Sequence, residues 1–414
     1  MSGARTAAAT YDYSAPPAAA APSRARIGSI DIVRGAVMVL MAIDHVRVYA
    51  GVPPGGPTPG VFFTRWVTHF CAPAFIFLAG TAAYLYGHGV RSRASQGERV
   101  RTRGELARFL LVRGLWLVLL ELTILRFGWT FNFDYASFTF AGVIWAIGWS
   151  MVVLAALCAL PAGVVGAIGV AIILTHNALA PLLDRGDASG PLLRVLYAGG
   201  GFPIPGLGWN LAILYVLLPW IGVMAAGYGF GVVMRLDAAA RRRVCLFLGG
   251  AAVLLFVVLR VTDGYGDPRP WSQLAARMPS PLAFLNTTKY PASLQFLLMT
   301  LGPTLLLIPA LENARGRVAR WLEVFGRVPF FYYVLHIPLI HVVAVLISLV
   351  RTPRSTGWLV ANHPLMPPPV PDGYMWSLPM LYLVTALVVV ALYFPCRWYA
   401  RVKATSPNRW LSFL

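Results

Sequence analysis

Long apolar stretches, separated by short charged or proline-rich segments, follow one another along almost the whole chain. About ten of them are long enough, or nearly so, to cross a bilayer as a helix, which takes about 20 residues. They cover residues 28–50, 61–87, 106–126, 138–160, 163–182, 208–233, 244–261, 293–311, 326–350 and 378–399. This pattern predicts an all-α, polytopic integral membrane protein with about ten transmembrane helices.

The two ends of the chain depart from this pattern. Residues 1–26 are rich in Ala, Pro and Ser and contain no apolar core followed by a cleavage site, so we expect a disordered cytoplasmic tail and not a signal peptide. Residues 27–400 are expected to form the transmembrane domain, and residues 401–414 a short second tail on the same cytoplasmic side.

The composition supports a membrane protein, because 58% of the 414 residues are hydrophobic and only 12% are charged. The formal net charge is +19, but the basic residues are spread over short loops, which argues against nucleic acid as a partner. Arginines cluster at residues 91–103, 235–243 and 315–320, and these clusters alternate with less basic loops. By the positive-inside rule, the clusters and both termini face the cytoplasm. The four cysteines are scattered without a CxxC pair and predict neither a disulfide framework nor a metal site.

The first apolar stretch carries ionisable residues at membrane depth. On a helix, one stripe holds Asp31, Arg34, Met38, Met41 and His45. Arg34 and His45 lie about 16 Å apart along the axis, with Arg34 near the cytoplasmic face and His45 towards the outer one. Ionisable groups are expensive in hydrocarbon and usually face a partner or a watery cavity, so the stripe is a candidate functional site.

Two readings stay open for each charged group on this stretch. His45 beside Asp44 is a candidate general base, and the alternative is a histidine paired with Asp44 or Arg47 at the outer interface. Asp31 and Arg34 have the spacing of a plain ion pair, whereas a guanidinium at that depth could also bind a phosphate.

Polar residues near the outer side of three later stretches could complete such a site. Arg65 and His69 share one face of the second stretch, where Pro73 predicts a kink that lines a cavity or is satisfied by a neighbour. Further polar groups, which could bind a sugar or simply pack, are Asn286 and Lys289 before the eighth stretch and His336 in the ninth.

Four blocks of sequence are distinctive, and they read RIGSIDIVRGAVMVLMAIDH, FFTRWVTHFCAPAFIFLAGTAAYL, FLNTTKYPASLQFLLMTLGP and FFYYVLHIPLIH. These blocks resemble the bacterial members of the heparan-alpha-glucosaminide N-acetyltransferase catalytic-domain family, and the resemblance extends over residues 27–400. This family is similar to the broader transmembrane acyltransferases, including the acyltransferase-3 group, whose first helix carries a basic residue, ten further residues and a histidine. Arg34 and His45 match that marker.

The resemblance implies acyl transfer across the membrane, with acetyl-CoA or another acyl-CoA as donor and no metal. His45 would be the general base or a transient acyl carrier, Asp44 would orient it, and His69 would assist. The donor's path would contain Arg34, with Asp31 and Arg65. The acceptor would be an amine or hydroxyl of a sugar or glycan at the outer side, near His336, Lys289 and Asn286.

The resemblance has one departure. The lysosomal enzyme of this family uses a histidine in the loop after its first helix, but here that loop, GVPPGGPTPGV, has none. That enzyme also has an asparagine at the position of His45. The mechanism and the glucosamine acceptor of that enzyme therefore do not carry over as a whole, and His45 becomes the main candidate base.

The overall prediction is an acyltransferase of the bacterial inner membrane, in contact with the lipid bilayer and compatible with a homo-oligomer. A transporter of a small anion or sugar could use the same intramembrane charges for substrate and proton coupling. The chain shows no evident inverted repeat, which counts against a transporter. A non-catalytic membrane protein that keeps the fold is a further alternative.

Overall fold

The computed structural model describes residues 28–56, 58–88, 102–183, 190–204, 206–406, 408 and 411, and these residues are mostly helical. Each of the ten predicted stretches contains a helix. The long helices are α1 (Gly28–Tyr49), α3 (Cys71–His88), α5 (Arg103–Leu120), α7 (Val143–Leu157), α8 (Ala162–Thr175), α11 (Leu217–Phe230), α12 (Ala238–Val261), α15 (Leu294–Ala310), α16 (Arg317–Arg327), α17 (Pro329–Arg351) and α19 (Leu378–Thr405).

Parts of the two predicted tails and of one arginine cluster lie outside the described residues, among them residues 407, 409, 410 and 412–414 of the C-terminal tail. The N-terminal tail of residues 1–26 lies wholly outside them, and so does most of the arginine cluster of residues 91–103. At the other end, α19 continues as helix past residue 400, the predicted end of the transmembrane domain, to Thr405.

Five helical segments of the described residues are long and apolar enough to cross a membrane. They are Pro59–His88, Leu217–Arg235, Ala238–Val261, Pro329–Arg351 and Leu378–Thr405. Three shorter apolar helices, α7, α8 and α15, accompany them. The chain is therefore a multi-pass membrane protein, while the count of ten spans and the cytoplasmic side of the termini stay predictions.

A small sheet corrects the all-α prediction. Within the described residues, three strands pair in the order β1 (Thr139–Ala141), β3 (Trp209–Ile213) and β2 (Gly200–Ile204). The β1–β3 pair is parallel and the β2–β3 pair is antiparallel. Stretches 138–160 and 208–233 thus begin as strands and only then become helices. A short run of apolar residues has the same sequence pattern in a buried strand as in the first turn of a buried helix, so hydrophobic periodicity does not distinguish the strand from the helix.

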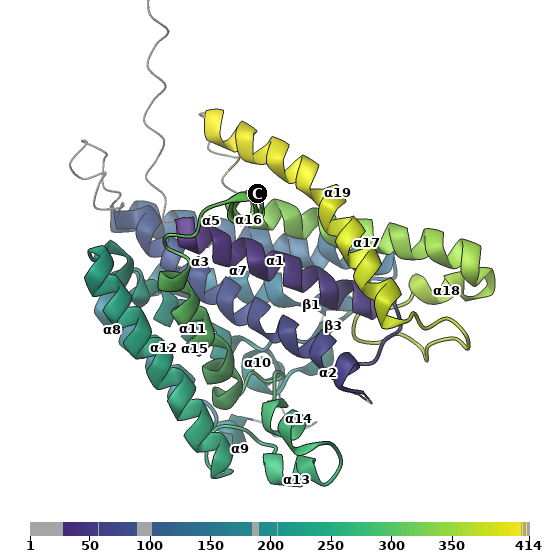
Figure 1. The fold of residues 1–414 in the computed structure, drawn as a ribbon, viewed down its shortest axis with the longest axis horizontal. Helices are drawn as coiled ribbons and strands as arrows, with labels where there is room; N and C mark the ends of the chain where they lie inside the picture. The colour runs from purple at the N-terminus through teal and green to yellow at the C-terminus, as the bar shows by residue number, and fades with distance from the viewer. Residues whose placement is uncertain are drawn as a thin grey trace, which may run out of the picture.

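Helix α1 lies in the middle of the molecule and packs against α3, α15, α16, α17 and α19 (Figure 1). Glycines set its distance from α16. A Cβ on Gly35 would collide with the backbone oxygen of Leu322, and a Cβ on Gly326 with that of Asp31. The two backbones therefore touch, as small residues allow in membrane helices.

The second apolar stretch is helical throughout but not uniform. It consists of α2 (Pro59–Trp66), a 3₁₀ turn over Val67–Phe70 and then α3. The tighter turn ends just before Pro73, which cannot donate a backbone hydrogen bond. The helix is therefore irregular near Pro73, and the irregular turn is the one that carries His69.

The third apolar stretch ends in a π-helical turn over Glu121–Leu125, followed by α6 (Arg126–Thr130). Glu121 in this turn is fully buried. Its Oε2 accepts hydrogen bonds from the backbone N–H groups of Ile144 at 2.7 Å and Trp145 at 3.1 Å. A carboxylate at the start of α7 satisfies donors that the helix itself leaves unpaired, and it also lies at the positive end of the helix dipole.

Candidate active site

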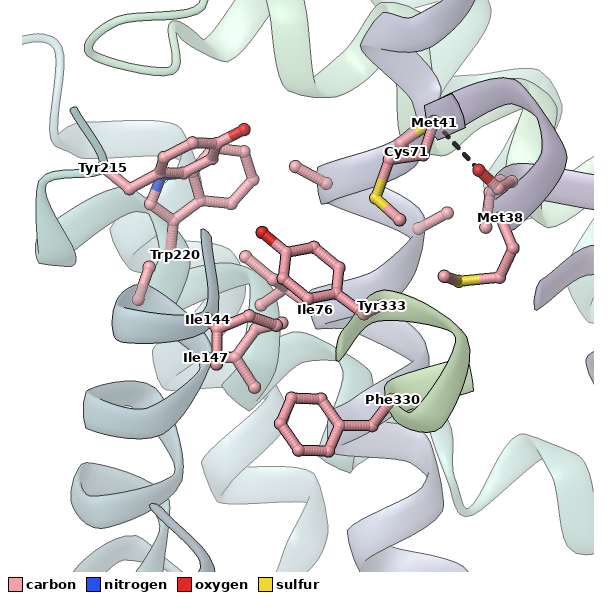
Figure 2. Close-up of a cluster of buried hydrophobic side chains, with 14 of the residues drawn as sticks. Met38, Met41, Cys71, Ile76, Ile144, Ile147, Tyr215, Trp220, Phe330 and Tyr333 are labelled. Carbon is pink, nitrogen blue, oxygen red and sulfur yellow. Dashed lines mark hydrogen bonds between the residues drawn. The ribbon is translucent and has the colours of Figure 1, made fainter. Parts of the chain in front are cut away.

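A cavity of about 450 Å³ runs beside α1, between α3, α5, α7 and α17. Its lining includes Ile30 and His45, which are fifteen residues apart on α1, so the cavity extends for about 22 Å along that helix. The middle of the wall is apolar. Figure 2 shows part of it, including Met41, Ile144, Ile147 and Phe330.

Cationic side chains line the cavity around the first turns of α1. Arg34 is 4.0 Å from Asp31 and also donates to the carbonyl oxygen of Leu78 at 2.7 Å. Arg113 of α5 lies within electrostatic range of Arg34. Arg327 follows Gly326, which touches the backbone of Asp31, and Lys403 of α19 also lines the cavity. This cationic end, defined as Arg34, Arg113, Arg327 and Lys403, can receive an anionic group.

At the far end of the cavity, the lining residue His45 stacks on His336, which does not itself line the cavity. His45 Nδ1 lies 2.6 Å from His336 Nε2, and the rings are 4.8 Å apart. His336 Nδ1 lies 2.7 Å from the carbonyl oxygen of Tyr333. The edge of Trp129 packs against His45 with ring centroids 4.8 Å apart. The imidazole of His45 is therefore held on two sides.

With both rings neutral, this geometry assigns their tautomers. A carbonyl oxygen only accepts, so His336 Nδ1 carries a proton and its Nε2 is an acceptor. His45 Nδ1 is then the donor to His336 Nε2, which leaves the Nε2 of His45 with a free lone pair. His45 lines the cavity, and an imidazole held in this tautomer is a base ready to take a proton there.

Asp44 is held by two arginines. It accepts from Arg47 Nε at 2.9 Å and from Arg65 at 2.8 Å. Arg65 also donates to Thr68 at 3.2 Å and to the Tyr290 hydroxyl at 3.4 Å. Among the described residues, the structure records no hydrogen bond between Asp44 and His45. The side chain within hydrogen-bond distance of His45 is instead His336, which the sequence indicated as a residue that binds a sugar or simply packs.

The model of the family described as "Heparan-alpha-glucosaminide N-acetyltransferase, catalytic" matches residues 26–259, more than half of the chain. The chain belongs to this family. No curated protein matches the chain. The family match and the long apolar helices together make this chain a membrane protein with a transferase domain. The matched region contains Arg34, Asp44, His45 and Arg65, whereas His336 on α17 lies beyond it.

Three further residues that the sequence singled out differ in whether they line the cavity. Lys289 lines the cavity, with its ammonium 5.9 Å from the centre of the Tyr215 ring and 5.3 Å from that of Tyr290. His69 is buried outside the lining, edge-on to Phe296. Asn286 also lies outside the lining, with its side chain against the sulfur of Met278. Lys289 is thus the one of these three that can meet a ligand in the cavity.

The described residues contain no group of three or more His, Cys, Asp or Glu side chains that could hold a metal ion. The four cysteines are all buried and unbridged, and Cys71 donates to the backbone oxygen of Val37. The lining near the far end of the cavity includes the imidazole of His45, the ammonium group of Lys289 and the tyrosines Tyr215 and Tyr333.

Replacing the carboxylate of Asp44 should destabilise the folded protein. We expect Asp44→Asn to lower the free energy of unfolding by about 3 kcal/mol, because Arg47 and Arg65 lose their common counter-charge in a largely buried site. Thermal unfolding of the purified protein in detergent measures the effect. The matched control is Asp237→Asn at the exposed start of α12, where Asn caps a helix about as well as Asp. Equal melting temperatures for the two variants would contradict the prediction.

Proposed function

We propose that this protein transfers an acyl group, in the first place acetyl, from cytoplasmic acyl-CoA to an amine or hydroxyl of a sugar or glycan at the outer side. The observation that carries the proposal is one continuous cavity that joins the cationic end to His45. The family model supports acetyl transfer as the reaction. We place the protein in a bacterial inner membrane.

The two ends of the cavity suit the two ends of the donor. The cationic end offers guanidinium and ammonium groups to the phosphates of coenzyme A. The apolar middle, which includes Phe75, Ala79 and Leu110, suits the pantetheine arm. A volume of about 450 Å³ is within the usual range of about 300–1,000 Å³ for small-molecule sites. The thioester would then lie beside His45.

The chemistry at the thioester needs a base and a leaving group that can depart. The lone pair on His45 Nε2 takes a proton from the acceptor amine or hydroxyl while the acceptor atom attacks the thioester carbonyl carbon. The coenzyme A thiolate then leaves and takes the proton from His45. His336 Nε2 accepts from His45 Nδ1–H both before and after His45 takes the proton, so the orientation of the ring is kept.

The test of this function is turnover of radiolabelled acetyl-CoA by the purified protein in detergent, with label followed in acetate, protein and added amino sugars. Release or transfer of label by the wild type supports the proposal. If coenzyme A neither binds nor turns over, the acyl-transfer function is wrong, and transport of a small anion becomes the function to test.

The cationic end makes a separate prediction for donor binding. We expect Arg113→Gln to weaken coenzyme A binding about tenfold, since a hydrogen bond to a charged group contributes about 1.5–3 kcal/mol. The same variant should leave the rate at saturating donor almost unchanged. The control is Arg108→Gln on the exposed face of the same helix, which does not line the cavity. Equal dissociation constants for the two variants, measured by equilibrium binding, would count against a donor at this end.

A further inference from the structure

A tyrosine hydroxyl faces the same cavity as His45. Tyr333 of α17 lines the cavity, and its ring packs edge-on against His45 with centroids 6.2 Å apart and against His336 at 5.1 Å. Figure 2 shows the hydroxyl pointing away from α17, towards the side where Tyr215 and Trp220 lie. The phenol is thus next to the proposed base without being bonded to it.

The hydroxyl of Tyr333 differs from those of two other buried tyrosines in what it contacts. Tyr49 donates to the carbonyl oxygen of Trp129, and Tyr374 donates to that of Tyr49, each at 2.6 Å. Within the described residues, the structure records no hydrogen bond for the Tyr333 hydroxyl, although its side chain is only 5% exposed. Buried tyrosine hydroxyls usually have a partner, so a cavity ligand is the natural candidate.

Location in the cavity, and not the missing partner alone, distinguishes this tyrosine. The neighbouring Tyr332 also has a buried hydroxyl without a partner among the described residues, but it does not line the cavity. Tyr332 packs against Phe325 of α16 and is fully buried. The two adjacent tyrosines therefore offer one candidate and one matched control.

We propose that Tyr333 is a catalytic residue that donates a hydrogen bond to the carbonyl oxygen of the bound thioester and to the oxyanion formed there. The inference rests on the proposed function. The acceptor atom loses its proton to His45 Nε2 and bonds to the carbonyl carbon, and the carbonyl π electrons move onto the oxygen that faces Tyr333. When those electrons return, the carbon–sulfur bond breaks and the thiolate takes the proton from His45.

A phenol suits this task because its O–H is a donor and its ring, on α17, lines the cavity beside His45. Donors aimed at the position where charge develops are among the largest contributions to catalysis, and removing one typically lowers kcat about 10²–10³-fold. Lys289 at the same end of the cavity can stabilise negative charge as well, but it sits over the rings of Tyr215 and Tyr290. The edge contact with the His45 ring makes Tyr333 the better-placed donor.

The experiment compares Tyr333→Phe with Tyr332→Phe in acetyl-CoA turnover, each with thermal unfolding measured alongside. We expect Tyr333→Phe to lower kcat about a hundredfold at every pH, with the KM for acetyl-CoA raised only several-fold and the melting temperature close to wild type. Tyr332→Phe should keep wild-type kcat. A role in positioning His45 would instead shift the pH–rate profile, and that result would overturn the proposal.

A donor without a carbonyl oxygen provides a second readout. S-ethyl-CoA, a thioether, should bind to wild type and Tyr333→Phe equally, whereas acetyl-CoA should bind to the variant several-fold more weakly. If the wild type turns acetyl-CoA over and Tyr333→Phe does so equally well, the inference on Tyr333 fails and the acyltransferase function stands. If the wild type shows no turnover, the proposed function fails and the inference fails with it.

Discussion

His45→Gln is expected to lower the rate of acetyl-CoA turnover about a thousandfold, which is within the usual range for loss of a general base. The amide of Gln is similar in size to the imidazole and can still donate to His336 Nε2, so the stacked arrangement at the end of α1 should persist. What the variant loses is a lone pair able to take a proton. Coenzyme A binding at the cationic end, some 16 Å or more away by helix geometry, should stay close to wild type.

His69→Gln is the matched comparison for this experiment. The sequence predicted that His69 assists His45, but the structure buries it outside the cavity lining, against Phe296. We therefore expect its turnover to remain within about tenfold of wild type. The measurement is steady-state release of coenzyme A at saturating acetyl-CoA. If His69→Gln were inactive and His45→Gln active, the base would be His69, and the assignment of His45 would be wrong.

The pairing partner of His45 shows where prediction from the sequence ends. The helical stripe on the first stretch follows from a local periodicity, and in the structure Asp31, Arg34, Met41 and His45 all line one cavity. His336 is 291 residues further along the chain. Which of several polar side chains on another helix meets His45 depends on how α1 and α17 pack, and no local pattern encodes that distance. Asp44, the neighbour in sequence, was the natural choice for that partner, and in the structure its carboxylate accepts hydrogen bonds from Arg47 and Arg65.

The strands and the π-helical turn were missed for a related reason. The residues of β1 and β3 are apolar and continuous with the helices that follow them, so hydrophobicity alone places them inside a helix. The role of Glu121 depends on α7 starting beside it, because its carboxylate caps that helix. Both features are decided by what a short segment packs against, whereas the existence of the long apolar helices is decided by composition.

The close contact between α1 and α16 gives the prediction with the largest effect on folding. We expect Gly35→Leu to abolish the accumulation of folded protein, because even a Cβ at this position would overlap the backbone of Leu322. Backbone atoms cannot move aside as the end of a flexible side chain can, so the helices must separate. Gly326 meets the backbone of Asp31 in the same way, and Gly326→Leu should behave alike.

A graded series separates this packing effect from helix propensity. Gly35→Ala should still fold but lose about 1–3 kcal/mol of stability, a typical cost of overpacking, although Ala is the better helix former. Gly163→Leu is the control, since this glycine of α8 is exposed and a Cβ there meets no atom within 4 Å. Fluorescence-detected size-exclusion chromatography measures the amount of folded protein, and thermal unfolding in detergent measures its stability. A stable and monodisperse Gly326→Leu protein would show that α16 is not packed on α1 as described. Gly326 also lines the cavity, so that result would remove one wall of the cationic end as well.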